Sequence, residues 1–321
     1  MDARIVFMGS PQFALPTLRR LLDSGHQVVA VYTQPDRPAG RGRSLQPPPA
    51  KELALARGVP VFQPTRVSAP EAVAELVSLR PDLIVIAAYG QILKQPVLDV
   101  PRRSALNVHA SLLPRHRGAS PVAAAILAGD EETGVSIMQV ELALDAGPVL
   151  ASRRLPIDPW DTTGSLTRRL AEEGTDVLTE VLPGWLKGTL EAVPQDESQA
   201  TYAPVVRKED GRLDWRLPAE ELWRRVRAYN PWPGAFTLLD GQPLRILEAW
   251  PLPTDADVAP GTVVAAPADA GAQMGGRPAA FAVQTGRGLL VAVTVQKAGR
   301  RALPADEFLR GQRGLLGKRL G

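Results

Sequence analysis

The sequence predicts an α/β protein in which a domain with a mostly parallel sheet is followed by a smaller β-barrel domain. Three observations lead to this fold class. Strand-like apolar runs alternate with amphipathic helices over residues 1–188, which indicates βαβ units. Beyond residue 207, short apolar runs are separated by Gly, Pro and Asp, as is typical of a small barrel. The chain is 321 residues long, more than a single small core requires.

The elements of the first domain follow in order along the chain. Short, mostly apolar runs predict strands at residues 3–9, 27–33, 61–63, 83–90, 104–109, 134–140 and 149–155. Apolar side chains at three- and four-residue spacing predict helices at residues 15–22, 52–58, 69–80 and 122–129. A long helix over residues 165–186 closes the domain, and Thr162 or Thr163 can serve as its N-cap.

The pattern changes after residue 188. Residues 189–206 are polar, interrupted by proline and without a clear period, so they are predicted to form a linker. A second domain is expected over residues 207–321, with one amphipathic helix at 221–229. Its strands are expected at 235–240, 244–250, 261–266, 281–285 and 288–296. The small-residue segment 266–280 is expected to be a mobile surface loop.

Composition excludes several classes of protein. With 45% hydrophobic and 22% charged residues, the chain resembles an ordinary soluble globular protein. It has no cysteine, which removes disulfides, zinc–thiolate sites and thiol nucleophiles. No apolar run is long enough to span a bilayer, and the start lacks the pattern of a signal peptide. We therefore expect a cytoplasmic protein that does not interact with membranes.

The net charge of +3 is unevenly distributed. Residues 205–321 hold 17 Lys and Arg against 12 Asp and Glu, whereas the rest of the chain holds 20 against 22. A basic appendage on a near-neutral body suits a polyanionic partner. Ordinary solvated faces in an arginine-rich protein explain the same pattern equally well.

Two segments near the N-terminus lie where α/β folds bind ligands. Residues 7–16 form a strand-to-helix turn, but a single glycine is no G-x-G-x-x-G fingerprint, so nicotinamide or flavin binding is not expected. The segment 33–49 leaves a strand and carries Arg37, Arg41 and Arg43 among glycines and prolines. It is either a basic loop that grips a phosphate backbone or an exposed flexible linker.

Two further segments carry candidate catalytic groups. In a strand over residues 104–109, Asn107 and His109 point to the same face. Burying an amide and an imidazole together is costly unless both are partnered or used. Both can donate to an oxygen on which negative charge develops. Asp145 lies between apolar runs and is either a turn cap or the partner that holds the imidazole and raises its pKa.

Together these motifs resemble the formyltransferases that use 10-formyltetrahydrofolate. The resemblance rests on Asn107-Val108-His109, Ser111 to Pro114, Arg117-Gly118 and Leu144-Asp145-Ala146-Gly147. Four more segments resemble the members of that family that act on methionyl-tRNA: FMGSPQFALPTL, TQPDRPAGRGRSLQPPP, PDLIVIAAYGQIL and AYNPWPGA. They extend the resemblance over essentially the whole chain.

The resemblance implies a Rossmann-like catalytic domain and an OB-like C-terminal barrel that binds tRNA. It implies transfer of a formyl group from 10-formyltetrahydrofolate to the α-amino group of methionyl initiator tRNA, giving formylmethionyl-tRNA for translation initiation, with no metal. The implied catalytic residues are Asn107, His109 and Asp145. The implied folate site is lined by Ser111, Leu112, Leu113, Pro114, Tyr89, Gly90 and Gln91, and the implied tRNA contacts are Arg37, Arg41 and Arg43.

These roles give an expected mechanism. Asn107 and a protonated His109 would stabilise the oxyanion that forms when the amine attacks the formyl carbon, and Asp145 would support the imidazolium. His116 departs from the family, which usually has Trp or Tyr there, so the loop could be looser. Formyl transfer to a small-molecule amine, formyl-tetrahydrofolate hydrolysis and a tRNA-binding module without catalysis remain alternatives. A monomer is expected, because two domains that clamp one tRNA need no symmetry.

Overall fold

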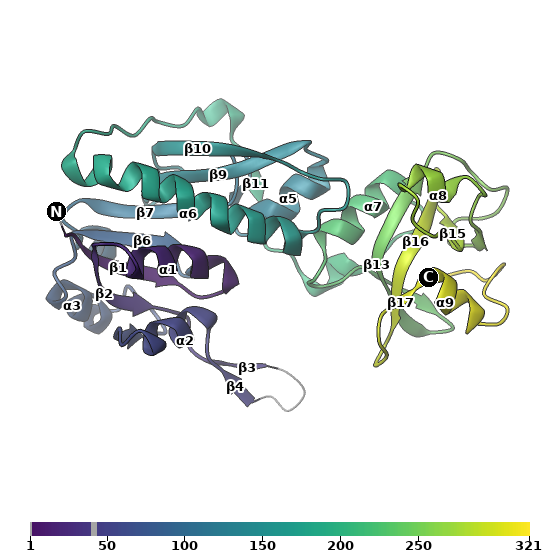
Figure 1. Ribbon diagram of the computed structural model, residues 1–321, viewed down its shortest axis with the longest axis horizontal. Helices are drawn as coiled ribbons and strands as arrows, with labels where there is room; N and C mark the ends of the chain where they lie inside the picture. The colour runs from purple at the N-terminus through teal and green to yellow at the C-terminus, as the bar shows by residue number, and fades with distance from the viewer. Residues whose placement is uncertain (1, 40–43) are drawn as a thin grey trace. The chain divides into compact units, whose positions relative to one another are not determined.

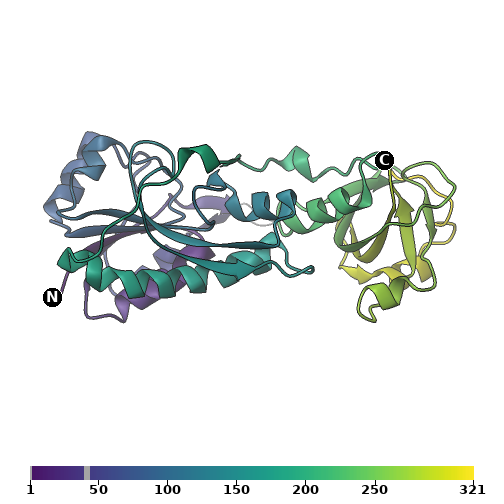
Figure 2. The same ribbon diagram turned by 90° about the horizontal axis from the view of Figure 1, so that it is seen from above.

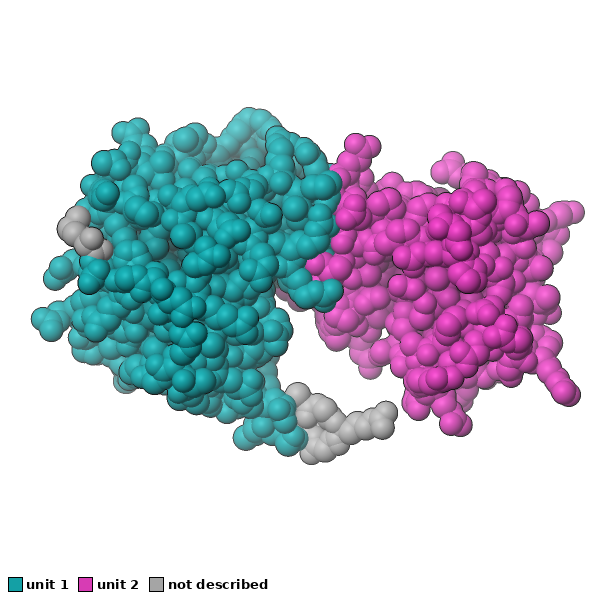
Figure 3. Space-filling model, in the orientation of Figure 1, with its two compact units in different colours: residues 1–121, 132–156, 166–203 teal, residues 122–131, 157–165, 204–321 magenta. Residues whose placement is uncertain are grey.

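The computed structural model describes residues 2–39 and 44–321 of the chain, which divides into two compact units. Unit 1 comprises residues 1–121, 132–156 and 166–203, and unit 2 comprises residues 122–131, 157–165 and 204–321, coloured teal and magenta in Figure 3. Two short segments, residues 122–131 and 157–165, therefore belong to unit 2 although the residues on both sides of them in the sequence belong largely to unit 1. The domain limits predicted at residues 188 and 207 stay a prediction.

Unit 1 is built on a seven-stranded sheet in the order β10-β9-β7-β6-β1-β2-β5 (Figure 1). Five neighbouring strands, from β7 to β5, run parallel, and β9 pairs antiparallel with both β7 and β10. The predicted mostly parallel, Rossmann-like sheet is thus confirmed. Its strands are β1 (Arg4–Gly9), β2 (Gln27–Tyr32), β5 (Val61–Phe62), β6 (Leu83–Ala87), β7 (Ser104–His109), β9 (Glu132–Gln139) and β10 (Val149–Pro156).

Helices cover both faces of this sheet. On one face lie α1 (Leu15–Leu22) and α6 (Thr163–Lys187), which are joined by a hydrogen bond of 3.0 Å between the hydroxyls of Thr17 and Thr175 (Figure 2). On the other face, α3 (Pro70–Ser78) and α4 (Gln95–Leu98) bury apolar side chains against β1, β2 and β6. The remaining helix of unit 1 is α2 (Pro49–Ala56). The central strands β1, β6 and β7 are buried on both faces, which is why they appear in the sequence as mostly apolar runs.

The N-cap of α6 follows its sequence. The hydroxyl of Thr162 accepts the amide of Ser165 at 3.1 Å, and the hydroxyl of Ser165 accepts the amide of Thr162 at 2.9 Å. These reciprocal bonds satisfy donors that the first turn of a helix leaves free. Thr162 is therefore the cap, one of the two residues predicted.

Residues 189–203 have structure of their own within unit 1. They include a short 3-10 helix over Glu197–Gln199 and the strand β11 (Tyr202–Ala203), which pairs in parallel with β8 (Arg117–Gly118). This pairing brings the segment that the sequence predicted as a linker against the loop that follows β7.

Unit 2 contains an antiparallel half-barrel in the order β12-β13-β16-β15-β14, with β17 paired to β16. Its strands are β12 (Phe236–Leu239), β13 (Gln242–Leu252), β14 (Val263–Ala265), β15 (Phe281–Gln284), β16 (Leu289–Lys297) and β17 (Leu303–Pro304). The helices are α5 (Pro121–Ala128), α7 (Ala219–Ala228), α8 (Ala270–Gln273) and α9 (Ala305–Arg310). The second part of the predicted fold class, an antiparallel barrel-type domain, is confirmed.

One prediction for this unit differs from the structure. The segment 266–280, expected to be a surface loop, contains α8, and both Ala270 and Met274 are buried in an apolar cluster with Leu252 and Leu289. Small residues pack closely, so the composition did not reveal this burial. Among the residues that the structure describes, no helix is long and apolar enough to cross a membrane.

Candidate active site

The site begins on β7, a central strand of the sheet of unit 1. Asn107 is paired with Ile86 of β6 and Met138 of β9, and His109 lies opposite Ser136. Two residues apart on one strand, Asn107 and His109 share a face, as predicted. His109 is 5% exposed, whereas Asn107 is half-buried. Within the part of the chain that the structure describes, the side-chain amide of Asn107 has no hydrogen-bond partner, which leaves it available to a ligand.

The imidazole of His109 is held by two groups. Its Nε2 lies 3.1 Å from the backbone carbonyl oxygen of His116. A carbonyl oxygen only accepts, so Nε2 carries the hydrogen of the neutral ring and Nδ1 is its basic atom. Nδ1 lies 3.8 Å from Oδ2 of Asp145. The structure thus brings together two members of the predicted trio that lie far apart in the sequence.

Burial governs the charge on this ring. Loss of hydration lowers the pKa of His109, and the carboxylate of Asp145 opposes that effect only in part. The structure therefore favours a neutral imidazole in the free protein, contrary to our expectation of a protonated one. In a neutral ring of this tautomer, Nδ1 can accept a proton, while the N–H at Nε2 is already bound to the carbonyl of His116.

Of the two roles that the sequence left open for Asp145, the structure supports its placement beside His109, while its catalytic role stays a prediction. Its Oδ2 accepts the backbone N–H of Gly118 at 2.8 Å while facing His109, and its side chain is 16% exposed. The residue has a φ of +49°, which is unusual without glycine. Two residues later, a Cβ on Gly147 would overlap the carbonyl of Gln139, so this turn requires glycine there.

The loop after β7 is fixed by short polar contacts. The hydroxyl of Ser111 donates to the carbonyl of Arg115 at 2.6 Å. The hydroxyl of Ser136 accepts the amide of Leu113 at 3.1 Å and donates to the carbonyl of Ser111 at 2.8 Å. His116, which has a φ of +57°, is buried, and its amide donates to the hydroxyl of Thr201 at 2.8 Å. The loop is thus well braced through its backbone at the position where the sequence departs from the family.

The predicted folate residues lie at one edge of the sheet. Strand β6 is followed by Tyr89, Gly90 and Gln91, and β7 is followed by Ser111 to Pro114. Because β6 and β7 are parallel neighbours, both strands end at the same edge of the sheet. The ring of Tyr89 is buried in the apolar core, and the side chain of Gln91 binds the amide of Val67 and the carbonyl of Pro64. Gly90, in contrast, is exposed. A folate site at this edge stays a prediction. In such a site, Tyr89 and Gln91 would contribute backbone groups, because their side chains are engaged elsewhere.

The predicted tRNA contacts are described only in part. Arg37 is exposed on β3 (Arg37–Ala39), which pairs antiparallel with β4 (Ser44–Gln46), and its guanidinium donates to Gln34 at 3.1 Å. Arg41 and Arg43 lie outside the described residues. The arms of the segment thus form a hairpin, and its role stays a prediction.

Reasoning from sequence assigned no role to two residues of the site, Gln195 and Arg117, although Arg117 belongs to one of the motifs that carry the resemblance. The guanidinium of Arg117 is only 1% exposed and donates to the side chains of Gln195 and Glu197. The side-chain amide of Gln195 donates in turn to the backbone carbonyls of Asp145 and Gly147. Gln195 lies in a polar segment without a period, so no local signal marked it.

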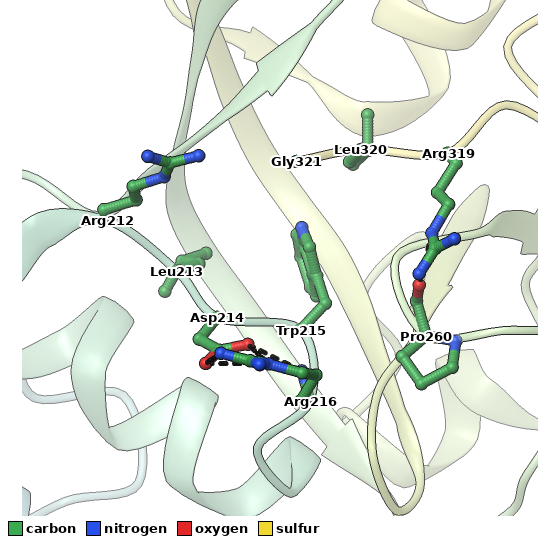
Figure 4. A pocket seen from close by; sticks show the side chains of 9 residues that line it. All are labelled: Arg212, Leu213, Asp214, Trp215, Arg216, Pro260, Arg319, Leu320 and Gly321. Carbon is green, nitrogen blue, oxygen red and sulfur yellow. Dashed lines mark hydrogen bonds and ion pairs between the residues drawn. The ribbon is translucent and has the colours of Figure 1, made fainter.

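Unit 2 has a hollow of about 660 Å³ lined in part by basic residues. Figure 4 shows Arg212 and Arg319 on opposite sides of Trp215. A third arginine, Arg216, is paired with Asp214 through bonds of 2.8 and 2.7 Å and holds the pKa of that carboxyl at about 2. The lining therefore combines this ion pair with the two arginines on either side of Trp215.

Comparison with known proteins places these features in a family context. The sequence matches the family described as formyl transferase over residues 3–182 and the formyl transferase C-terminal domain over residues 205–313. A methionyl-tRNA formyltransferase of Methylococcus capsulatus is 51% identical over 99% of both chains. Another, from Roseiflexus sp., is 49% identical over 100% of this chain and 96% of its own length.

Solved structures share the fold. An N-formyltransferase from Helicobacter canadensis, in complex with folinic acid and dTDP-3-aminofucose, has a TM-score of 0.67 and 16% identity, covering 92% of this chain and 100% of its own. HypX from Aquifex aeolicus, in complex with tetrahydrofolic acid, has a TM-score of 0.64 and 20% identity, covering 99% of this chain and 49% of its own. At these identities the likeness concerns the fold alone.

Proposed function

The chain belongs to the formyl transferase family, and we propose that it transfers the formyl group of 10-formyltetrahydrofolate to the α-amino group of methionyl initiator tRNA. The observation that carries this function is the identity of about half of all positions, over the full length, with methionyl-tRNA formyltransferases. The product, formylmethionyl-tRNA, serves translation initiation. On this proposal the enzyme works in the cytoplasm, where initiator tRNA is charged, and as a monomer.

The geometry supports a direct transfer with a single base. The amine nitrogen attacks the formyl carbon, and the carbonyl oxygen becomes an oxyanion to which the side-chain amide of Asn107 donates. His109 Nδ1 takes the proton that the attacking amine loses. The positive ring that results is stabilised by Asp145, 3.8 Å away, while Nε2 keeps its bond to the carbonyl of His116.

Collapse of the oxyanion completes the reaction. The bond from the formyl carbon to the folate nitrogen breaks, and the proton on Nδ1 passes to that nitrogen, which leaves His109 neutral again. No covalent enzyme intermediate is needed. Burial lowers the pKa of His109 and so favours return of the proton. One group thus serves as base and then as acid.

The remaining predicted residues fit supporting roles. We assign the folate to the edge of the sheet formed by residues 89–91 and 111–114, beside the catalytic strand. Arg37, Arg41 and Arg43 are assigned to the phosphates of the acceptor stem, and unit 2 to the tRNA body, because clustered positive charge binds a polyanion without reading its sequence.

An acceptor assay tests this function. The protein is incubated with 10-formyltetrahydrofolate and, in separate reactions, with methionyl initiator tRNA, methionyl elongator tRNA, an amino sugar nucleotide, glycinamide ribotide or buffer alone. We expect formylation of the initiator tRNA at a kcat/KM far above that of every other acceptor. Preferential formylation of a small amine, or folate deformylation at equal rate without any acceptor, would replace this function by one of the alternatives.

A further inference from the structure

Both polar atoms of the Gln195 side chain form two hydrogen bonds each within the candidate site. Its oxygen accepts two hydrogen bonds from Arg117, from Nε at 3.1 Å and from Nη2 at 2.8 Å. Its nitrogen donates two, to the carbonyl of Asp145 at 2.9 Å and to that of Gly147 at 2.7 Å. A glutamine whose four bonds all join other segments connects them rigidly.

One end of this connection is an immobilised cation. The guanidinium of Arg117 is 1% exposed, whereas its second partner, Glu197, is 68% exposed. A buried guanidinium requires partners for its donors, and together Gln195 and Glu197 engage all three of its nitrogens. The oxygen of Gln195 is therefore held in one place.

The other end is the turn that presents the catalytic carboxylate. Asp145 has a positive φ, a conformation that persists in a residue other than glycine only where surrounding contacts hold it. The side-chain amide of Gln195 donates to the backbone carbonyls of Asp145 and Gly147, the two residues that flank Ala146 in this turn. Fixing these carbonyls sets the direction in which the Asp145 side chain leaves the backbone, toward Gly118 and His109.

The same segment also holds the opposite side of the imidazole. The hydroxyl of Thr201 accepts the amide of His116 at 2.8 Å, and its carbonyl accepts the amide of Arg117 at 2.8 Å. The carbonyl of His116 in turn binds Nε2 of His109. Gln195 and Thr201 thus brace the two groups between which the ring is held.

We propose that Gln195 is a positioning residue for formyl transfer, which acts through Asp145 by linking its turn to the buried guanidinium of Arg117. This inference rests on the catalytic roles proposed above for His109 and Asp145. The separation of 3.8 Å between Nδ1 and Oδ2 is longer than a hydrogen bond, so small movements of the turn alter how strongly the carboxylate supports the ring.

Two substitutions of Gln195 distinguish its bonds to Arg117 from its bonds to the turn of Asp145. Gln195→Leu keeps the approximate size and removes all four bonds. Gln195→Glu keeps the acceptor for Arg117 and replaces the amide that binds the turn by an oxygen that repels both carbonyls. We expect both variants to lower kcat about tenfold to a hundredfold, as displaced catalytic groups do, with KM for folate and tRNA within about twofold of wild type.

Gln199→Leu is the matched control. Gln199 is exposed on the same segment, and its amide donates to Asp196 nearby. The control is expected to retain full kcat. If Gln195→Glu also retained full kcat, the bond to the Asp145 turn would have no role in catalysis and the proposal would be wrong.

Titration of His109 by NMR gives a readout that needs no substrate. The chain has three histidines, so the resonance is assigned by single replacements of the other two. The charged and titratable groups that face the ring are Asp145, which raises its pKa, and His116, which lowers it. With the carboxylate displaced, the pKa of His109 in Gln195→Leu should fall below that of wild type, while Gln199→Leu should match wild type.

An unchanged pKa of His109 in a folded Gln195→Leu protein would overturn the proposal. This result does not depend on the acceptor: a wild-type protein inactive toward methionyl-tRNA would refute the proposed function, yet its histidine would still titrate. The two proposals can therefore fail separately.

Discussion

Two loops of unit 1 leave the carboxyl ends of parallel strands, and they use arginine in opposite ways. After β7, Arg117 is buried and joins three segments through Gln195 and Glu197. After β2, Arg37 is exposed on a two-stranded hairpin and donates to the neighbouring Gln34. The first arrangement holds the polar groups around His109 and Asp145 in place, and catalysis requires such groups to stay within about 0.5 Å of the productive geometry. The second presents charge to the solvent, which is what attraction of a polyanion requires.

The largest effects should come from the trio held by the first loop. Asn107→Ala, His109→Ala and Asp145→Asn should each reduce kcat on the order of a hundredfold or more, because each removes charge stabilisation or the base. Asp145→Asn is the most specific of the three tests, because it removes the negative charge while an amide oxygen still accepts the N–H of Gly118. Single-turnover formylation measures the loss, with the exposed Asp176→Asn as control. Near-normal kcat in any of the three would remove that residue from the mechanism.

The pH dependence distinguishes a neutral from a charged His109. Because burial lowers its pKa below 6.5, the base form should predominate at neutral pH. As the pH falls through the lowered pKa, kcat/KM should drop about tenfold per unit, since protonation removes the base. The profile from pH 4.5 to 8 measures this. A decline on the alkaline side near pH 6.5 would instead support the protonated ring that the sequence led us to expect.

The turn at Gly147 should tolerate no side chain. Gly147→Ala places a methyl group against the carbonyl of Gln139, so the turn must shift and carry Asp145 with it. We expect the free energy of unfolding to fall by about 1–3 kcal/mol and kcat to fall roughly tenfold. Gly25→Ala, where the nearest atom is 3.8 Å away, is the control for both measurements. Equal stability and kcat in both variants would show that the turn can adapt.

The second loop should affect binding alone. Neutralising Arg41 and Arg43 should raise KM for methionyl-tRNA several-fold and lower the slope of its logarithm against salt by about one per lost phosphate contact. Folate affinity and kcat should stay unchanged. The exposed Arg57→Ala, at a site paired with Asp23, serves as the control. Identical tRNA kinetics in both variants would return the segment to a plain surface loop.

The smallest effect is expected at His116. Its contribution to His109 is made by a backbone carbonyl, and asparagine accepts a positive φ well. His116→Asn should therefore keep kcat within about threefold of wild type. A loss comparable with that of His109→Ala would mean that the imidazole of His116 itself takes part in the reaction.

The sequence predicted much of this protein because the relevant signals are local. The run at residues 83–90 is apolar because both faces of this parallel strand are buried, and the Thr162 cap follows from its place before a helix. Asn107 and His109 share a face because side chains alternate along any strand. The motif around Asp145 needed a resemblance to a family, since an acidic residue in a turn has no unique meaning.

The tertiary structure decided what depends on distant segments meeting. Asp145 faces His109 only because the turn after β9 returns to the edge where β7 ends, and Gln195 reaches Arg117 across 78 positions. Loss of hydration also depends on everything packed around a group, so the lowered pKa of His109 could not be read from its neighbours in sequence. Local periodicity fixes which residues are strand or helix. The partners and the charge of a buried polar group are set by the path of the whole chain.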